Sequence, residues 1–250
     1  RVLKEVSLIA AEDTRRTRKL LSHYDIHTPL TSYHEHNKQA KLGYLLGRLA
    51  EGDMALVSEA GTPGMSDPGY ELVAACLERG VAVVAVPGAS VVPMAVVVSG
   101  LPAARFLFLG FLPRKEGERE RLLREVAPLP YTLMALEAPH RLRQTLEHIR
   151  GVLGERRLAV CRELTKLYEE VFRGTPSTAL EHFTEPRGEF TLVIEGATEP
   201  PADVAAVEAE LRRLKKRGLT ARAALAELGG VSGLPRRELY RLWLKLKGGP

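Results

Sequence analysis

MALVSEAGTPGMSDPGY, residues 54–70, is the stretch from which the architecture of this chain can be predicted. A short β-favouring apolar run is broken by a GTPG turn that begins at Gly61, and the Pro-Gly pair at Pro68 starts a helix. Glycine lets main-chain groups approach a ligand, and proline stiffens the loop. In an open parallel α/β sheet, ligands bind at the carboxyl ends of the strands. The loop is therefore a candidate binding loop, although an ordinary strand-to-helix turn has the same composition.

A second stretch of this kind, VAVVAVPGASVVPMAVVVSGLP, covers residues 81–102. Its almost wholly apolar start is typical of a strand buried on both faces, so we predict a strand over residues 81–86. That run stops at Pro87 and passes at Ser90 into another apolar segment. Two strand ends that carry proline and glycine are thus expected to frame one crevice.

Length and composition indicate a soluble globular protein. The 250 residues allow one large or two ordinary domains, with 45% hydrophobic and 27% charged residues. Prolines interrupt the longest apolar stretch, which makes it a poor membrane span, and no signal peptide is visible. The two cysteines, Cys76 and Cys161, have neither metal-ligand nor redox spacing. We expect both to be small buried side chains of a protein in the reducing cytoplasm.

The positive charge is concentrated near the carboxyl terminus. The net charge is +5, and residues 198–250 hold eleven Lys or Arg against six Asp or Glu, so the remaining residues balance at 25 against 25. A local excess of Lys and Arg suggests a polyanionic partner, because contacts to phosphates release counterions. A solvated helical face has the same composition, so that alternative stays open.

Helices and strands alternate along the chain. Residues 1–5 end a helix, and the strand over residues 7–11 is followed by a helix for which Thr14 is the expected N-cap. A helix over residues 39–50, a strand over 54–58 and a helix over 69–79 continue a repeated β-α-β pattern, which predicts a parallel sheet.

After residues 101–105 the gaps shorten, which predicts a mixed sheet. The expected strands there are residues 105–113, 131–139, 156–164, 168–174 and 188–196, with helices over 116–126, 140–152 and 176–183. A linker at residues 198–203 then leads to a basic amphipathic helix over 204–217 and to a helix, a Gly-rich turn and a last helix with Pro235 in its first turn. We predict three domains: α/β domains over 1–103 and 104–197, and a basic helical domain, helix-turn-helix-like, over 198–250.

Three further motifs complete a recognisable set: AEDTRRTRKLL at residues 11–21, LEAPHRL at 136–142 and CRELTKLYEEVFRGT at 161–175. Together with the two loops they resemble the tetrapyrrole-methylase-fold methyltransferases, and within them the group that 2′-O-methylates a cytidine of 16S ribosomal RNA with S-adenosylmethionine. The resemblance runs from Glu5 to about Gly196. It implies a two-domain α/β fold with an inter-domain cleft, a homodimer, and a first strand and loop that would precede residue 1.

The resemblance also implies a cofactor site and a reaction that needs no metal. S-adenosylmethionine is expected to bind in the cleft against Gly61, Thr62, Pro63, Pro87, Gly88, Ala89, Ser90, Leu136, Glu137 and Ala138. Methyl transfer from a sulfonium is an in-line displacement, so the protein mainly aligns the donor with the acceptor and excludes water.

A ribose hydroxyl is weakly acidic, and a base or a cation near it would help the reaction. The candidates by residue type and position are Glu163, Lys166, Asp67, Asp13 and Glu59, and the sequence does not single out one general base. An ordinary charged surface is the alternative for Glu163 and Lys166. Glu137 and His140 flank a proline after a strand, and each is also a candidate to position the nucleobase.

Basic residues supply the candidate RNA contacts: Arg15, Arg16, Arg236, Arg237 and Arg241. His34 and His36 lack further metal ligands nearby and are expected in a polar loop that faces the crevice. Two other functions remain open, a tetrapyrrole C-methyltransferase of the same fold and a non-catalytic RNA-binding protein.

Overall fold

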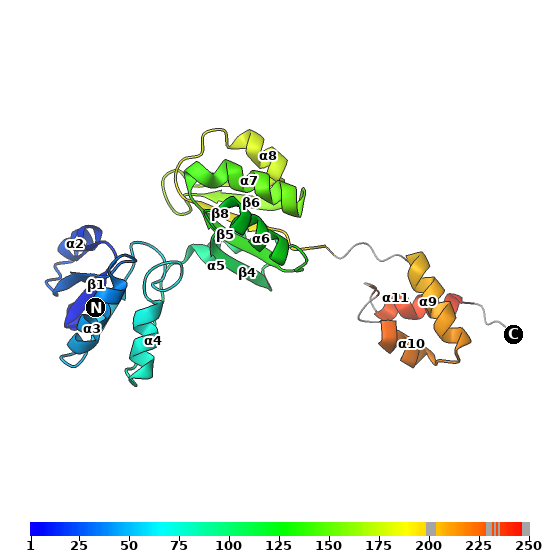
Figure 1. The fold of residues 1–250 in the computed structure, drawn as a ribbon, viewed down its shortest axis with the longest axis horizontal. Coiled ribbons are helices and arrows are strands. Elements are labelled where there is room, and N and C mark those ends of the chain that lie inside the picture. Colours follow the sequence, from blue (N-terminus) through cyan, green and yellow to red (C-terminus); the bar gives the residue numbers. More distant parts are fainter. Residues whose placement is uncertain (199–203, 229–231, 233, 235, 247–250) are drawn as a thin grey trace. The chain divides into compact units, whose positions relative to one another are not determined.

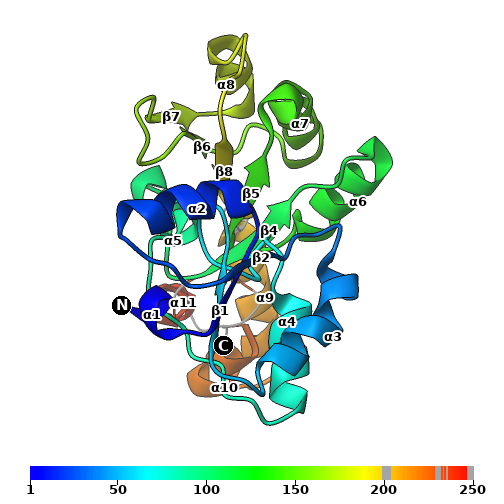
Figure 2. The same ribbon diagram turned by 90° about the vertical axis from the view of Figure 1, so that its left-hand side faces the viewer.

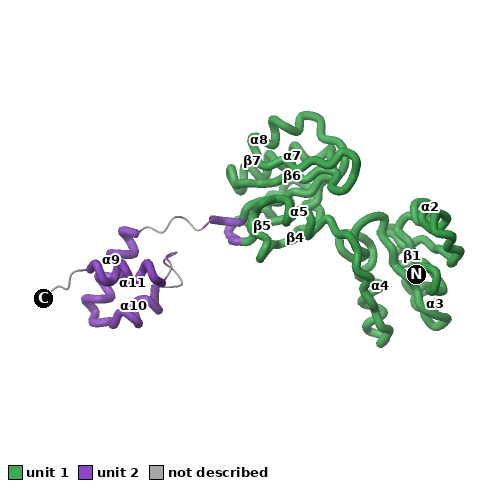
Figure 3. The backbone as a smooth tube through the Cα atoms, turned by 180° about the vertical axis from the view of Figure 1, so that it is seen from behind, with its two compact units in different colours: residues 1–127, 131–195 green, residues 128–130, 196–250 purple. Residues whose placement is uncertain are grey.

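The computed structural model describes residues 1–198, 204–228, 232, 234 and 236–246. Two compact units emerge (Figure 3): unit 1 comprises residues 1–127 and 131–195, and unit 2 comprises 128–130 and 196–250. Within the described ranges, no helix is long and apolar enough to cross a membrane. Most of the predicted linker, the Gly-rich turn at 229–230 and Pro235 lie outside the described residues.

The first sheet of unit 1 is parallel, as predicted, with the order β2-β1-β3. Its elements in chain order are α1 (Val2–Glu5), β1 (Leu8–Ala11), α2 (Thr14–His23), β2 (Leu30–Ser32), α3 (Lys38–Arg48), β3 (Met54–Val57) and α4 (Tyr70–Glu78). Apolar residues of α3 and α4 close one core with β1, in which Leu8, Leu45 and Leu72 are all buried. We call this region the first lobe.

The N-cap of α2 is Asp13, so the prediction of Thr14 was wrong. The Asp13 carboxylate accepts hydrogen bonds from the backbone N–H groups of Arg15, at 2.7 Å, and Arg16. A carboxylate reaches two of the unpaired N–H groups of the first turn and also opposes the positive end of the helix dipole. Thr14 is instead the first helical residue.

The prediction of a strand over residues 81–86 was also wrong. Residues 81–90 form neither helix nor strand, and the side chains of Val84 and Val86 are 83% and 67% exposed. A strand exists only through hydrogen bonds to a neighbouring strand, and no described residue pairs with this segment. Its apolar composition favours β structure, but the segment would become a strand only if a partner strand supplied the hydrogen bonds.

The second sheet of unit 1 is mixed, as predicted, in the order β4-β5-β8-β6-β7. Only β4 and β5 run parallel, and the other neighbours are antiparallel. The strands are β4 (Phe106–Phe111), β5 (Thr132–Glu137), β6 (Leu158–Arg162), β7 (Glu170–Gly174) and β8 (Phe190–Ile194), with α5 (Val91–Ser99), α6 (Glu116–Val126), α7 (Pro139–Leu153) and α8 (Pro176–His182). Helices α6 and α8 both contact α7 (Figures 1 and 2). We call this region the second lobe.

Helix α5 packs on the second sheet, although it falls within the range 1–103 of the first predicted domain. Val92 and Val96 of α5 are buried in one cluster with Met134 and Cys161. Cys161 is 1% exposed and Cys76 is 6% exposed, and both are free thiols, as expected of small buried side chains.

Unit 2 is a small helical body built from α9 (Val204–Lys216), α10 (Ala221–Leu228) and α11 (Arg236–Lys245), which matches the predicted helices. Leu211, Leu225, Leu239 and Trp243 belong to its core. Arg236, Arg237 and Arg241 are exposed on α11. The apolar stripe of each helix is therefore used for packing, and these three basic residues remain available to a partner.

Candidate active site

The carboxyl ends of two neighbouring parallel strands bring acidic side chains together. Glu12 follows β1 and Glu59 lies two residues after β3. The backbone N–H of Glu59 donates to Oε2 of Glu12 over 3.1 Å, and Nη1 of Arg16 lies 3.0 Å from Oε2 of Glu59. The first turn of α2 is thereby tied to the loop that follows β3.

The loop after β3 depends on glycine at defined positions. Gly61 and Gly64 have φ values of +85° and +81°, which other residues adopt at a cost in strain. A Cβ added to Gly69 would lie 2.7 Å from the backbone nitrogen of Gly64, so this loop folds back closely on itself. Ser66, with φ +66°, directly precedes Asp67. The tight loop fixes where the Asp67 carboxyl points.

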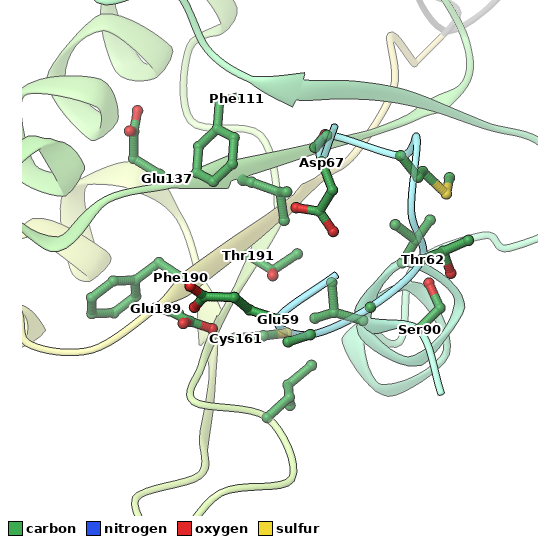
Figure 4. A pocket seen from close by; sticks show the side chains of 18 of the residues that line it. Glu59, Thr62, Asp67, Ser90, Phe111, Glu137, Cys161, Glu189, Phe190 and Thr191 are labelled. Atoms are coloured by element: carbon green, nitrogen blue, oxygen red, sulfur yellow. The ribbon is translucent and has the colours of Figure 1, made fainter. Parts of the chain in front are cut away.

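A cavity of about 410 Å³ lies between this loop and the second lobe. The first lobe and the following segment contribute Glu12, Glu59, Asp67 and Ser90, among others, and the second lobe contributes residues of β4, β5, β6 and β8. The side chains of Asp67 and Phe111 point into this space (Figure 4). Its size and mainly apolar lining with a few converging polar groups are typical of a small-molecule site.

Asp67 is the carboxyl group of the cavity whose protonation is most perturbed. Burial and the nearby negative charge of Glu12 raise the pKa of Asp67 to about 6, against the opposing hydrogen bond from Ser58. A carboxyl group with a pKa near 6 is mostly ionised at neutral pH, yet it binds a proton more readily than an ordinary aspartate. Asp67 therefore suits the role of a general base.

Glu163 and Lys166 form an ion pair in the loop after β6, and both contact Glu189, which precedes β8. The Glu163 carboxylate accepts from the N–H of Glu189 at 2.7 Å and from Nζ of Lys166 at 3.1 Å, and these bonds lower its pKa. Burial works against the charge of Lys166, but hydrogen bonds to Glu189 and Glu163 raise the pKa of its ammonium. Glu163 has φ +46°. Glu163 borders the cavity, whereas Lys166 does not line it.

The Glu137 carboxylate is engaged within the second lobe. It is 2% exposed and accepts from the N–H of Ala138 at 2.9 Å and from Oγ1 of Thr145 at 2.6 Å, and Nε of Arg141 lies 3.3 Å away. The contacts with Arg141 and Thr145 anchor the first two turns of α7 to the end of β5. The carboxylate therefore has a structural task, and His140 does not line the cavity.

The predicted site residues divide into two groups by position. Those that line the cavity are Gly61, Thr62, Ser90, Leu136, Glu137, Ala138, Arg16, Glu59, Asp67 and Glu163. Those that do not are Pro63, Pro87, Gly88, Ala89, Lys166, Asp13 and Arg15 of unit 1, and Arg236, Arg237 and Arg241 of unit 2. Asp13 and Arg15 instead border a separate acidic hollow that His34 and His36 also line. These histidines lie in a polar loop, as expected, but they do not line the cavity.

Comparison with known sequences decides the family. The profile described as Tetrapyrrole (Corrin/Porphyrin) Methylases matches residues 1–180, which include both loops and most of the second lobe. The chain belongs to this family. Its members are methylases, so the cavity at the ends of β1 and β3 is the candidate active site of a methyltransferase.

Individual relatives of this methylase are similar over nearly its whole length. The protein named Ribosomal RNA small subunit methyltransferase I from Synechocystis sp. is 49% identical over 252 residues, which covers 98% of this chain and 90% of that protein. The protein of the same name from Halalkalibacterium halodurans is 43% identical, over 97% of this chain and 87% of its own length.

Solved structures of other methylases share the fold. The methyltransferase CobJ superposes with a TM-score of 0.57 at 19% identity, over 80% of this chain and 87% of its own. Uroporphyrin-III C-methyl transferase from Thermus thermophilus, solved in complex with S-adenyl homocysteine, gives a TM-score of 0.53 at 21% identity, over 77% and 87%.

Sequence reasoning missed several residues that line the cavity of the methylase: Glu12, Phe108, Phe111, Glu189, Phe190 and Thr191. The sequence could have indicated Glu12, because it precedes Asp13 at the end of the same strand. The three phenylalanines had no such signal, since apolar residues in a strand ordinarily predict core.

One further group of potential metal ligands lies outside the cavity. Ligand atoms of Glu116, Glu120 and His148 come within 4.8 Å of one another. Nε of Arg119 donates to Nδ1 of His148 over 2.9 Å, which puts the imidazole proton on Nε2, where it faces Glu116 at 3.2 Å. Both nitrogens of His148 are thus occupied by protein contacts, and the group is a hydrogen-bonded network that joins α6 and α7.

Proposed function

We propose that this methylase transfers a methyl group from S-adenosylmethionine to the ribose 2′-hydroxyl of a cytidine in 16S ribosomal RNA. The observation that carries the proposal is the similarity, at 43–49% identity, to proteins named Ribosomal RNA small subunit methyltransferase I. That similarity covers 97–98% of the chain and so includes the basic helices of unit 2. The tetrapyrrole enzymes named above cover 77–80%.

The lining of the cavity fits S-adenosylmethionine. Carboxylates of Glu12, Glu59 and Asp67 surround one side, which complements a ligand that carries a sulfonium and an ammonium group. Apolar side chains and main-chain segments at Gly61, Thr62, Ser90 and 136–138 supply surface for an adenosine moiety. When bound, the cofactor supplies an activated methyl group. The family relative solved with S-adenyl homocysteine supports the same choice of ligand.

Asp67 accepts the proton of the acceptor hydroxyl in this mechanism. A base with a pKa of about 6 is mostly ionised at neutral pH and can take up the proton that the ribose hydroxyl loses. Glu163 has the wrong properties for this step, because its lowered pKa makes it a weaker base. The Arg16–Glu59 ion pair ties the first turn of α2 to the loop after β3, which helps to fix the position of that loop for aligning the hydroxyl and the donor.

The proposal also covers the cellular location, the oligomeric state and the RNA contacts of the enzyme. The enzyme acts in the cytoplasm as a homodimer, its substrate is the small ribosomal subunit or its RNA, and unit 2 binds RNA phosphates through Arg236, Arg237 and Arg241. Support comes from the exposure of these arginines, the charge of residues 198–250 and the names of the relatives.

A tetrapyrrole C-methyltransferase is the alternative that the shared fold favours. A non-catalytic RNA-binding protein is a third possibility, and calorimetric titration with S-adenosylmethionine tests it because such a protein need not bind the cofactor.

The deciding experiment offers labelled S-adenosylmethionine and three acceptors: small ribosomal subunits, naked 16S ribosomal RNA and a precorrin. The expected result is label in RNA, at a cytidine whose 3′ phosphodiester resists alkaline hydrolysis because its 2′-oxygen is methylated. Mass-spectrometric mapping then identifies the position. Label in the precorrin alone would assign the alternative function.

A further inference from the structure

The ring of Phe111 borders both the main cavity and a neighbouring hollow of the second lobe. It lines the main cavity, and it also lines a neighbouring hollow of about 760 Å³ formed with Leu112, Pro113, Arg114, Ala138, His140 and Arg141. The side chain of Phe111 is 55% exposed, although it belongs to a sheet strand. A large exposed apolar ring beside a candidate active site indicates a surface that binds a partner.

A bulge in β4 turns this ring toward the cavity. Between the pairs Phe108–Met134 and Phe111–Leu136, β4 contains one residue more than β5. Residues three apart in a regular strand point to opposite faces, whereas here both phenylalanines line the cavity. The extra residue is accommodated at Gly110, which has φ +64°.

The loop that follows Phe111 is rigid, because two arginines bind its carbonyl oxygens. Nη2 of Arg141 donates to the carbonyls of Leu112 and Pro113 at 2.7 and 2.9 Å. Nη1 of Arg119, which is fully buried, donates to the carbonyl of Pro113 at 3.1 Å. The backbone next to Phe111 is therefore held in place, and little of its conformational entropy is lost when a planar partner stacks on the ring.

This neighbouring hollow beside Phe111 is basic. Arg114, His140 and Arg141 line it, and no acidic residue is among its lining residues in the part of the chain that the structure describes. The side chain of Arg114 makes no ion pair or hydrogen bond with any described residue. An unpaired guanidinium beside an exposed aromatic ring provides the two contacts that single-stranded RNA uses, a phosphate contact and a base stack.

We propose that Phe111 and the Arg114 hollow form a nucleotide subsite for the acceptor RNA. A base stacks on the Phe111 ring, and the adjoining phosphate binds Arg114 and His140, which holds the reacting ribose near Asp67. This subsite rests on the proposed function, because it takes the acceptor to be RNA.

The test compares Phe111→Ala with Phe106→Ala. Phe106 lies at the opposite end of β4, is 40% exposed and lines neither hollow, so it controls for the loss of an exposed ring from the same strand. Phe111→Trp retains a stacking surface, and Arg114→Gln removes the unpaired charge. Each variant is assayed for thermal stability, for the Kd of S-adenosylmethionine, for binding of a fluorescein-labelled single-stranded oligoribonucleotide, and for kcat and KM with 16S ribosomal RNA.

For Phe111→Ala we expect kcat/KM for RNA and oligoribonucleotide affinity to fall about 5- to 100-fold, with the Kd of S-adenosylmethionine unchanged. Phe111→Trp and Phe106→Ala should stay within about twofold of wild type, and Arg114→Gln should lower RNA affinity with a flatter salt dependence. A weaker Kd for S-adenosylmethionine in Phe111→Ala, with RNA affinity retained, would assign the ring to the cofactor and overturn the subsite. So would a Phe111→Ala enzyme that matches wild type on RNA.

The two proposals fail in different ways. If the wild-type enzyme methylates no RNA and binds no oligoribonucleotide, the proposed function fails, and the subsite fails with it. If the wild-type enzyme methylates RNA and the Phe111 and Arg114 variants do so equally well, only the subsite fails.

Discussion

The backbone N–H of Glu59 donates to the side-chain Oε2 of Glu12 over 3.1 Å. This bond joins the residues that follow β3 and β1, two neighbouring parallel strands, at their carboxyl ends. It leaves two carboxylates beside Asp67, and the charge of Glu12, after burial, contributes most to the raised pKa of Asp67. The predictions below begin from this acidic group.

The activity of the enzyme should depend on the ionisation of Asp67. Since the base must be deprotonated, kcat should rise with pH through about 6 and then level off. Asp67→Asn should lower kcat about 10²- to 10⁴-fold and remove this rise, while the Kd of S-adenosylmethionine changes little. Single-turnover rates between pH 5 and 8 provide the measurement. An unaltered pH profile in Asp67→Asn would exclude Asp67 as the base.

The stability of the protein should also depend on the ionisation of Asp67. The free energy of unfolding should fall as pH rises, whereas kcat should increase. Because the folded state raises the pKa of Asp67 above its unfolded value, the carboxylate form destabilises the fold, and this cost appears as pH rises from about 4 to 6. Asp67→Asn should therefore be more stable than wild type at pH 7 by about 1 kcal/mol, after allowance for solvent screening. Urea unfolding at pH 7 and pH 4 checks this, and the difference should vanish at pH 4.

The binding loop should tolerate no side chain at Gly69. A Cβ there would lie 2.7 Å from Gly64 N and 3.1 Å from Leu56 Cδ2, so Gly69→Ala must push the loop off β3. We expect a loss of about 1–3 kcal/mol in the free energy of unfolding and weaker binding of S-adenosylmethionine. Gly47→Ala in α3 is the control, because nothing lies within 4 Å of its added Cβ. That change should stabilise the protein by about 0.5–1 kcal/mol.

Glu137 should prove structural. Its removal leaves the buried hydroxyl of Thr145 and the guanidinium of Arg141 without their carboxylate, so Glu137→Ala should cost about 2–4 kcal/mol of unfolding free energy. Glu147→Ala, at an exposed position of α7, should change stability by less than about 0.5 kcal/mol. Chemical denaturation of both variants checks the difference. Equal stabilities would show that the Glu137 contacts are not needed.

The basic residues of α11 should contribute RNA affinity alone. Replacing Arg236, Arg237 and Arg241 with alanine should weaken RNA binding and flatten its dependence on salt concentration, because fewer counterions are released. Donor affinity should stay the same, since the cavity belongs to unit 1. The matched control replaces Arg121, Arg124 and Arg150, three exposed arginines of α6 and α7. RNA affinity that is unchanged in the α11 variant would mean that these residues serve the structure of unit 2.

Periodicity and turn residues predicted much of this fold, and the failures have identifiable causes. Helix α6 matches its predicted range, and the mixed second sheet follows from the short gaps between its strands. At Asp13 and Thr14 two good capping residues compete, and the choice depends on which side chain reaches the free N–H groups. Residues 81–86 failed because β-structure requires a partner strand, which apolar composition does not supply.

The sequence by itself determined the family, the parallel first sheet, the glycine loop at Gly61 and the candidate carboxylates, because local pattern and motif order are written in the chain. The tertiary structure alone decided which carboxylate is raised toward a pKa of 6, that Glu163 and Glu137 are engaged in holding the second lobe, and that Phe111 faces the cavity. Burial, neighbouring charge and a one-residue bulge all arise from contacts between segments distant in sequence. Local sequence patterns therefore do not predict these features.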